Sequence, residues 1–334
     1  METHRRVTWL LGCLCALLLC GGTARATDIC GAIPATLTIT ENSQLVCDVV
    51  CTQQAGPCIQ FGAPNIWLRL NGFKMTGQAD PPANCVATNN FLPEDGISTN
   101  NQDNVAILGP GLVERFRRHG MFLVNGTKLE VKHVTSHHNC FSGLQMVNVT
   151  DSDIEENVSV RNASASGPFP CGGNCISNSH NNRIRRNEFS GNGSIAPGPP
   201  GALPNDFGVG LVGNSSGNVI EENGIGGNIN GVRVAPTAVN NLIRRNVIAG
   251  NPPVQVSASF GAAIGVDIRD FSPPGANTFE ENLCITYTGA TTPPPCPNIP
   301  KFAGHKNTSQ SSSRNNASPS SSRDDNSQNS PRAP

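Results

Sequence analysis

Aromatic and charged residues are scarce in this sequence. Only 5% of its 334 residues are Phe, Trp or Tyr, and 14% are charged, with a formal net charge of −1. Nucleic acids and anionic membranes require a basic face, which this charge balance does not supply. Large aromatic side chains usually fill a globular core, whereas this chain is rich in glycine (35) and proline (26). We therefore expect neither a nucleic-acid-binding protein nor a conventional globular domain.

The sequence also lacks a long apolar run. Its most apolar stretch, Trp9–Cys20, is well short of the ~20 residues that span a bilayer, so no stable membrane insertion is expected. Arg5 and Arg6 precede this stretch, and Ala24-Arg25-Ala26 follows it with small residues at both ends. This order is typical of a signal peptide. We predict a signal peptide over residues 1–26 and a secreted or periplasmic mature chain.

Cysteine usage fits an exported protein. Three of the 13 cysteines (Cys13, Cys15 and Cys20) lie in the expected signal peptide, and the rest are even in number, which indicates disulfides in an oxidising compartment. A lipoprotein with Cys13 as its first residue is the alternative, but it would leave almost no apolar segment before the cut. The spacing favours three bridges: Cys51–Cys58, Cys171–Cys175 and Cys284–Cys296.

The other cysteines, Cys30, Cys47, Cys85 and Cys140, are not assigned by spacing. Cys171 and Cys175 could also be read as half of a zinc site. No second half with metal-ligand spacing follows, so a bridge that closes a loop is favoured.

A repeat of 23 or 24 residues, marked by glycines, runs through the chain. Gly96, Gly120 and Gly143, and later Gly208 and Gly231, each open a short apolar strand at intervals of 24, 23 and 23 residues. A second apolar position follows each glycine by 11 or 12 residues. This period suits one coil of three short strands, which buries its apolar face only against neighbouring coils. We predict an all-β, right-handed parallel β-helix solenoid of roughly eight coils.

A four-residue motif marks one position in successive coils. An apolar residue, two like charges and an asparagine recur at Ile154–Asn157, Ile184–Asn187, Ile220–Asn223, Ile243–Asn246 and Phe279–Asn282. A further asparagine recurs eight residues after the apolar position, at Asn139, Asn162, Asn192, Asn228 and Asn251. Asparagine tolerates the left-handed backbone of a tight turn, and stacked asparagines can hydrogen-bond between strands. We expect two asparagine columns along the solenoid.

The charged residues of this motif alternate in sign from coil to coil. The two columns read Lys132, Glu155, Arg185, Glu221, Arg244, Glu280 and His133, Glu156, Arg186, Glu222, Arg245, Glu281. The paired glutamates could be the acid and base of a glycoside-cleaving site. However, stacked strands lie about 4.8 Å apart, so each carboxylate would sit between two cations. We favour ladders that fix the register over a catalytic pair.

The pattern divides the chain into segments. Residues 27–64 are expected to form an N-terminal cap and residues 65–304 the β-helix. Stretches rich in Pro, Gly and Ala near 168–171, 197–204 and 252–262 interrupt the repeat and are expected as loops. Residues 305–334 contain mainly Ser, Asn, Arg and Pro and are expected to be a disordered tail.

The segment Asn65–Gly77 contains a strand, an Asn-Gly turn and a second strand, and it follows the cysteine-bearing segment Cys30–Cys58. It resembles the opening coil of bacterial right-handed β-helix repeat proteins of the pectin-lyase-like superfamily, and the resemblance covers about residues 30–300. It implies the fold. It implies little about activity, because that superfamily includes polysaccharide lyases, hydrolases, epimerases, phage tailspikes and periplasmic proteins linked to copper-enzyme maturation.

The strand after each glycine supplies the first candidate site. Five residues are expected to lie on or near its outer face: Phe122, Gln145, Arg233, Asp267 and Arg269. In the polysaccharide-acting proteins of the resembled superfamily, such a face binds sugar chains through Arg, Asp and aromatic side chains. The simpler interpretation is that an exposed strand needs polar residues.

Histidines supply the second candidate site. His133, His137 and His138 lie near one another in sequence, and Arg117, Arg118 and His119 belong to the preceding coil. A metal site or a general base is one interpretation. Solvated turn residues are the other, since His137 and His138 directly precede Asn139 of an asparagine column.

Complete catalytic sets of the superfamily's enzymes are missing from the sequence. It has no Asn-Thr-Asp, Asp-Asp and Gly-His-Gly set as in polygalacturonases, no Asp-Pro-His as in alginate epimerases, and no Arg-x-Pro-x-x-Arg as in pectate lyases. We therefore favour a non-catalytic exported monomer, without a cofactor, that binds a glycan or cell-envelope component along one face. A polysaccharide lyase or related carbohydrate-active enzyme is the alternative, and copper or other metal handling is a third possibility.

Overall fold

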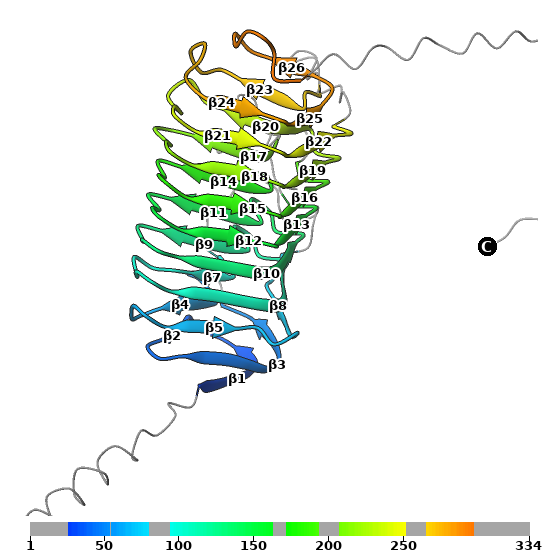
Figure 1. The fold of residues 1–334 in the computed structure, drawn as a ribbon. Helices are drawn as coiled ribbons and strands as arrows, with labels where there is room; N and C mark the ends of the chain where they lie inside the picture. Colours follow the sequence, from blue (N-terminus) through cyan, green and yellow to red (C-terminus); the bar gives the residue numbers. More distant parts are fainter. Residues whose placement is uncertain are drawn as a thin grey trace, which may run out of the picture. The chain divides into compact units, whose positions relative to one another are not determined.

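The structure is a computed structural model that describes residues 26–53, 55–79, 94–162, 172–193, 207–251 and 265–296. Nearly all of the expected signal peptide, the expected tail 305–334, Cys85 and Cys171 lie outside these residues. None of the described residues forms a helix long and apolar enough to cross a membrane. The described chain is all-β, and it winds into the right-handed parallel β-helix that the repeat predicts (Figure 1).

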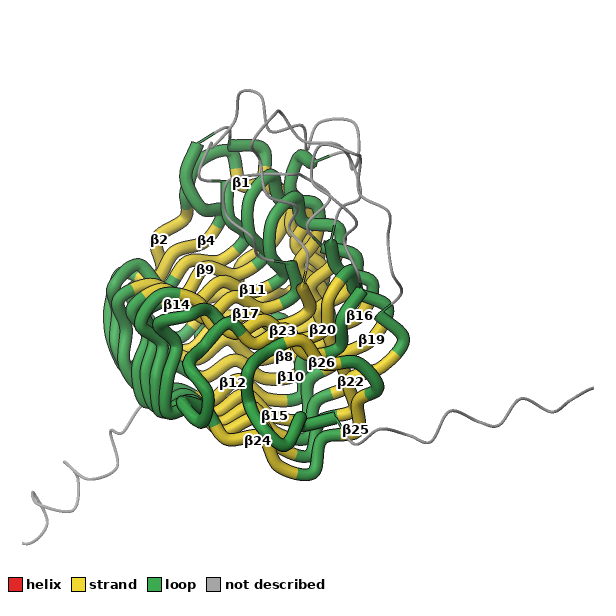
Figure 2. Tube along the Cα trace, turned by 90° about the horizontal axis from the view of Figure 1, so that it is seen from above, coloured by secondary structure: helices red, strands yellow, loops and turns green. Residues whose placement is uncertain are grey.

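Two parallel sheets make up the walls of the solenoid (Figure 2). The 10-stranded sheet consists of β2 (Leu37–Ile39), β4 (Ile59–Phe61), β7 (Ile97–Ser98), β9 (Met121–Val124), β11 (Leu144–Val147), β14 (Asn174–Ser177), β17 (Phe207–Val212), β20 (Asn230–Val234), β23 (Ile268–Asp270) and β26 (Tyr287–Thr288). The 16-stranded sheet consists of β1 (Thr27–Ile33), β3 (Ser43–Cys51), β5 (Trp67–Arg69), β6 (Lys74–Thr76), β8 (Ala106–Glu114), β10 (Glu130–His137), β12 (Asp153–Glu155), β13 (Val158–Val160), β15 (Arg183–Arg185), β16 (Glu188–Ser190), β18 (Val219–Glu221), β19 (Gly224–Gly226), β21 (Leu242–Arg244), β22 (Val247–Ala249), β24 (Thr278–Glu280) and β25 (Leu283–Cys284).

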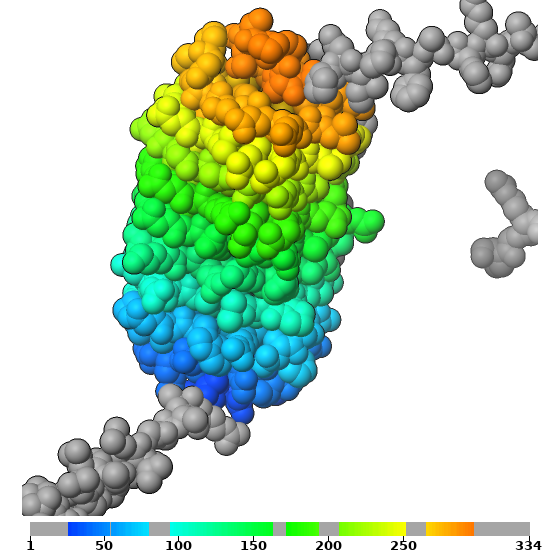
Figure 3. Space-filling model, in the orientation of Figure 1, coloured from blue at the N-terminus to red at the C-terminus, as the bar shows by residue number. Residues whose placement is uncertain are grey.

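Each coil contributes one strand to the 10-stranded sheet. The strands from β7 to β26 belong to eight coils, the number that the repeat predicts, and the coils follow one another as bands of colour in Figure 3. The segment expected as a separate cap, residues 27–64, adds two more coils, because β1 pairs in parallel with β3 and β2 with β4. Strand pairing therefore begins at Thr27, with no break at residue 65.

The core is built from inward-facing apolar residues at matching positions of successive coils. Ile154 pairs in register with Val131 before it and Ile184 after it, and all three are at most 1% exposed. The same column continues through Ile220 and Ile243. Because these residues stack between neighbouring coils, the core is a continuous column of mainly aliphatic side chains.

Buried asparagines hold the corners of the coils. In one column, Asn187 accepts hydrogen bonds on Oδ1 from the backbone N–H of Asn157 (2.9 Å) and from Asn157 Nδ2 (3.0 Å), and its own Nδ2 donates to the carbonyl of Ile154 (2.9 Å). The column through Asn139 and Asn162 repeats this arrangement. The two expected asparagine columns are therefore hydrogen-bonded ladders, which satisfy backbone groups at corners that the sheets cannot reach.

A third ladder was not expected. It runs through Ser152, Asn182, Asn218, Asn241 and Asn277. Its signal in the sequence is an asparagine two residues before the core isoleucine, as in Asn182-Arg183-Ile184. All three corners of the coil thus carry a buried polar ladder.

The expectation that the asparagine of each motif adopts the left-handed backbone is wrong. The positive φ belongs to the charged residue before it, such as Glu156 (φ 55°), Arg186 (53°) and Arg245 (52°). The side chains of Arg186 and Arg245 are 40% and 42% exposed, so their charges stay in water. The asparagine side chain points into the corner, where its amide hydrogen-bonds to the next coil. The charged residue before it points outward and adopts the left-handed backbone conformation of the turn.

Disulfides fasten the first and last coils. Cys30 pairs with Cys47, Cys51 with Cys58, and Cys284 with Cys296, and the last two are among the pairs that spacing favours. Cys140 and Cys175 are also disulfide-bonded. The expected Cys171–Cys175 bridge stays a prediction because Cys171 lies outside the described residues. The end coils have a neighbour on one side only, and there a crosslink that constrains the unfolded chain adds stability that stacking cannot.

Asn174 is an exception within the core. It lies on β14 between Leu144 and Val209, is fully buried, and neither of its side-chain amide atoms has a hydrogen-bond partner in the described part of the chain. An unsatisfied buried amide costs about 1–3 kcal/mol. We expect Asn174→Val to raise the melting temperature by ~2–6 °C in calorimetry. Asn192→Val, which removes a paired amide, should lower it, and a lower value for both would contradict the assignment of Asn174.

Candidate functional site

The alternating charges form ladders on the 16-stranded sheet. Strand register places Lys132, Glu155, Arg185, Glu221, Arg244 and Glu280 side by side. Glu155 accepts from Arg185 Nη2 at 2.9 Å and is also paired with Arg186. Glu155 and Glu221 are only 6% and 1% exposed. Both carboxylates are therefore engaged by arginines, which supports register ladders over the acid–base pair that the sequence also suggests.

Glu221 shows the electrostatics of these ladders. Its carboxylate is bonded to Arg183 Nε (2.7 Å), Arg244 Nε (2.9 Å) and Arg245 Nη2 (3.0 Å). Burial raises the pKa of Glu221, but hydrogen bonds and charge from Arg183 and Arg244 outweigh it, so the pKa lies below its usual value of 4.5. A lowered carboxyl pKa stabilises the fold above pH 4.5, and the stabilisation is lost as the pH falls through the folded-state pKa.

The three histidines proposed for a metal do not converge. His133 Nδ1 lies 3.2 Å from Glu156 Oε2 and continues the second charge column. His137 Nε2 lies 3.3 Å from Glu114 Oε2, and its Nδ1 is 2.7 Å from His138 Nδ1. Among the described residues, no group of three or more His, Cys, Asp or Glu side chains could hold a metal ion. The arrangement favours turn and ladder roles.

The outer face of the 10-stranded sheet holds four of the five candidate ligand-binding residues. Phe122, Gln145, Arg233 and Arg269 belong to one column of outward positions that also includes Ser98, Cys175 and Gly210. The column is interrupted in its middle, where Gln145 is only 8% exposed. A Cβ at Gly210 would lie 2.1 Å from the Phe207 ring, so only a glycine leaves the space that this ring occupies.

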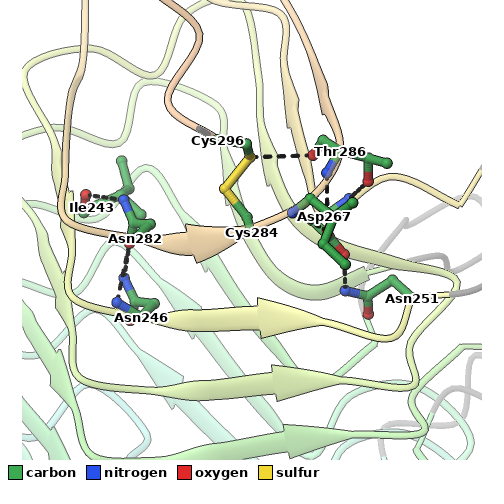
Figure 4. The surroundings of a disulfide bond; sticks show 9 residues. Ile243, Asn246, Asn251, Asp267, Asn282, Cys284, Thr286 and Cys296 are labelled. Carbon is green, nitrogen blue, oxygen red and sulfur yellow. Dashed lines mark hydrogen bonds between the residues drawn. A yellow bond between two sulfur atoms is a disulfide. The ribbon is translucent and has the colours of Figure 1, made fainter. Parts of the chain in front are cut away.

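The expectation that Asp267 points outward is wrong. Asp267 is 3% exposed and takes the place of the coil glycine, since its carbonyl accepts from Val232 just as the carbonyl of Gly143 accepts from Met121. Its carboxylate accepts from Asn251 Nδ2 (2.8 Å) and from the backbone N–H groups of Ile285 (2.8 Å) and Thr286 (3.1 Å), as Figure 4 shows in part. Asp267 thus ends an asparagine ladder by accepting from the side chain of Asn251, and its carboxylate is engaged inside the coil.

An arginine–phenylalanine cluster, defined as Phe207, Arg233, Arg269 and Phe271, lies toward the C-terminal end of this face. Arg233 Cζ lies 5.5 Å from the centre of the Phe207 ring and 5.6 Å from that of Phe271, and Arg269 Cζ lies 4.9 Å from the Phe271 ring. Arg233 and Arg269 are direct cross-strand neighbours on β20 and β23. Phe271 is 41% exposed, and the half-buried side chains of Arg233 and Arg269 lie beside its ring.

A second group, the acid–histidine cluster, lies nearer the N-terminal end. It contains Glu94, Asp95, Arg117, Arg118 and His119. Asp95 Oδ1 accepts from the backbone N–H of His119 (3.1 Å), and Asp95 Oδ2 lies 3.4 Å from Arg118 Nη1. Glu94 is paired with Arg117 Nε.

Phe122 is engaged by this cluster. Its ring stacks on His119, with centroids 5.5 Å apart and planes at 19°, and Arg118 Cζ lies 4.6 Å from its centre. The aromatic residue that sequence reasoning proposed for sugar binding is therefore already stacked against His119 and Arg118.

Burial shifts the protonation of this cluster. Desolvation raises the pKa of the Asp95 carboxyl to about 6, although the charge of Arg118 and the bond from His119 oppose the change. Desolvation, together with Arg118, holds the pKa of His119 well below 6.5. His119 is therefore neutral, and since its Nδ1 accepts from the backbone N–H of Ser142 (3.3 Å), the proton is on Nε2.

The raised pKa of Asp95 predicts a pH dependence. The folded state holds this proton more tightly than the unfolded state, so Asp95 adds stability as the pH falls through 6 toward 3.8. Relative to the Asp95→Asn variant, the wild type should gain about 2 kcal/mol between pH 7.5 and 4.5. Melting temperatures of both proteins across this range measure the difference. Parallel curves would show that Asp95 titrates normally.

The described strands form a right-handed parallel β-helix. Residues 95–282 match the family described as right-handed β-helix region, which is more than half of the chain, and the chain belongs to this family. No curated protein matches it in sequence.

Several solved structures are similar to this chain. The periplasmic alginate epimerase AlgG is similar with a TM-score of 0.54 and 16% identity, over 78% of this chain and 59% of the AlgG chain. The enzymatically active domain of tailspike protein 2 from bacteriophage CBA120 has a TM-score of 0.44, 12% identity and coverage of 77% and 41%. Pectate lyase Pel9A has a TM-score of 0.30 and 13% identity, over 80% of this chain and 69% of the Pel9A chain. The chain thus spans less than two thirds of the AlgG structure.

Proposed function

We propose that the chain is an exported β-helix protein that binds an acidic glycan on the outer face of the 10-stranded sheet, without catalysis, through the arginine–phenylalanine cluster. The observation that carries this proposal is the pair Arg233 and Arg269 on adjacent strands beside the exposed ring of Phe271. Guanidinium groups bind carboxylates with two parallel hydrogen bonds. An aromatic ring offers an apolar surface to the face of a sugar.

The class of ligand is supported by the fold neighbours. AlgG is an alginate epimerase, and alginate is a polysaccharide. Two cations placed about 4.8 Å apart along the stack suit a chain of acidic sugars that runs parallel to the solenoid axis. The disulfides and the expected signal peptide over residues 1–26 support a secreted or periplasmic location. The His133, His137 and His138 geometry supports metal handling less than either function.

A carbohydrate-active enzyme is the second candidate, and one observation favours it. Asp95 is a buried carboxyl with a raised pKa beside Arg118, a combination found at sites of proton transfer. If this function is correct, incubation with polyuronates releases unsaturated products that absorb ultraviolet light, and Asp95→Asn abolishes the release. Binding without product formation would favour the non-catalytic function.

The binding proposal predicts a specific loss. The double variant Arg233→Ala/Arg269→Ala should bind alginate or polygalacturonate at least 10-fold more weakly in calorimetry, because each lost charge-assisted contact is worth roughly 1.5–3 kcal/mol. Arg69→Ala is a matched control, since Arg69 also lies over an aromatic ring (Trp67, 4.5 Å) but on the 16-stranded sheet. Equal affinity of the double variant and the control would reject the site.

A further inference from the structure

The 16-stranded sheet ends in an open edge. β24 and β25 are its last strands, and no described strand follows them on this side (Figure 1). At every inner rung, the left-handed residue donates its backbone N–H to the next coil, as Glu222 does to the carbonyl of Arg244 (3.2 Å) and Arg245 to that of Glu280 (2.9 Å). Within the described chain, the equivalent N–H of Glu281 has no acceptor. The edge therefore keeps the hydrogen-bonding pattern of a coil that could be extended.

The asparagine ladders end differently at the corners of the last coil. The ladder through Asn251 ends on Asp267, whose carboxylate accepts from Asn251 Nδ2. The ladder through Asn246 is not closed in this way (Figure 4). Asn282 Oδ1 accepts from Asn246, and Asn282 Nδ2 donates to the carbonyl of Ile243, but in the described residues its backbone N–H lacks the amide oxygen that every inner rung receives. The backbone N–H of Asn282 therefore lacks only the asparagine oxygen that a further coil would supply.

The charge ladders also end on incomplete rungs. Glu155 and Glu221 each contact arginines in neighbouring coils, and Glu222 Oε1 lies 3.1 Å from Arg245 Nη2. Arg244 and Arg245 are directed back toward Glu221. Among the described residues, the exposed carboxylates of Glu280 and Glu281 form no ion pair. The alternation along the stack leaves two adjacent carboxylates where the next rung would carry two cations.

Apolar side chains flank this edge. Val247 and Leu283 are cross-strand neighbours on β22 and β25 and are 52% and 53% exposed, and Ile285 is 58% exposed. These three residues rank among the most exposed large aliphatic side chains of the described chain. An added strand that covers the edge would also remove part of this surface from water.

We propose that the edge formed by Thr278–Leu283 is a docking site for an extended strand of a partner protein, whose sequence carries two adjacent basic residues followed by Asn or Asp. Backbone pairing would extend the sheet by one strand. The two basic side chains would contact Glu280 and Glu281, and the Asn or Asp oxygen would accept the N–H of Asn282. Charge complementarity selects this partner, since an acidic strand would place carboxylates against carboxylates at about 4.8 Å.

The chain itself supplies matched probes. A labelled peptide of residues 241–248 (Asn-Leu-Ile-Arg-Arg-Asn-Val-Ile) reproduces a basic rung, and residues 218–225 (Asn-Val-Ile-Glu-Glu-Asn-Gly-Ile) reproduce an acidic one. Fluorescence anisotropy with the intact mature protein should show at least 10-fold tighter binding of the basic peptide. The variant Glu280→Arg/Glu281→Arg should reverse the preference. Arginine is tolerated at these positions, since Arg245 adopts the same left-handed backbone (φ 52°) one coil earlier, and circular dichroism checks the fold.

Three outcomes would overturn the proposal. In the first, neither peptide binds, or both bind equally to the two proteins. In the second, the basic peptide binds only after truncation behind Cys296, which would mean that residues 297–334 occupy the edge. In the third, the intact chain self-associates in sedimentation experiments and Glu280→Arg/Glu281→Arg abolishes the association, which would make a second copy the occupant.

Discussion

Replacing Asn187 with leucine is expected to lower the melting temperature by about 10 °C, a large effect for one substitution. The change removes the acceptor for the backbone N–H and Nδ2 of Asn157, and it removes the donor to the carbonyl of Ile154. Each buried group left without a partner costs roughly 1–3 kcal/mol. Because the ladder is continuous, the loss is felt in the coils on both sides. Differential scanning calorimetry measures it directly.

Asn214→Leu is the matched control for this variant. Asn214 lies at an exposed turn and is not part of an asparagine ladder. The same substitution there should therefore change the melting temperature by less than about 2 °C. If Asn187→Leu were as stable as Asn214→Leu, the asparagine columns would not contribute to stability, and packing of the apolar core alone would hold the coils together.

The parts of the fold that repeat could be predicted from the sequence. Ile184-Arg185-Arg186-Asn187 differs from Ile220-Glu221-Glu222-Asn223 mainly in the sign of two charges, and this difference revealed both the stacking and its register. A period that conserves apolar, charged and amide positions together leaves few architectures other than a parallel solenoid. The strand register of Arg185 on Glu221 confirms the inferred phase.

Prediction failed where the period is interrupted. Asp267 follows the Pro-, Gly- and Ala-rich stretch near 252–262 that interrupts the repeat, so counting from the preceding glycine could not show that Asp267 replaces the coil glycine. Its burial as the end of a ladder depends on Ile285 and Thr286, which belong to the next coil. The handedness of single turn residues was also missed, because a charged residue with positive φ has no composition signal of its own.

The acid–histidine cluster was missed for a related reason. Asp95, His119 and Ser142 are each the residue before a coil glycine, and stacking brings them together although they are 24 and 23 residues apart. Arg118 and His119 are neighbours in the sequence and form a visible local cluster, whereas Asp95 lies in the preceding coil. Reading the column before each glycine would have found this group, whereas its burial and shifted pKa values depend on packing.

The charge ladders provide the second large prediction. The variant Arg244→Glu/Arg245→Glu should lose about 3–5 kcal/mol of stability, because it removes two partners of buried Glu221 and replaces them with carboxylates. Glu280 and Glu281 on the next coil would then face like charges as well. Chemical denaturation at pH 7 measures the loss. The loss should shrink as the pH falls below 4.5, where the carboxylates become protonated.

Compensation should be possible from one side only. Adding Glu280→Arg/Glu281→Arg to the reversed variant restores opposite charges between the last two coils, so part of the lost stability should return. In the wild-type protein, Arg183 and Arg185 lie beside the carboxylate of Glu221. Glu221→Arg would place a third positive charge next to these two arginines, so adding it to the reversed variant should restore little of the lost stability. Equal rescue from both sides would show that only net charge matters. Rescue from the 280–281 side alone would show that stability depends on which coils are neighbours, as register-specific pairing requires.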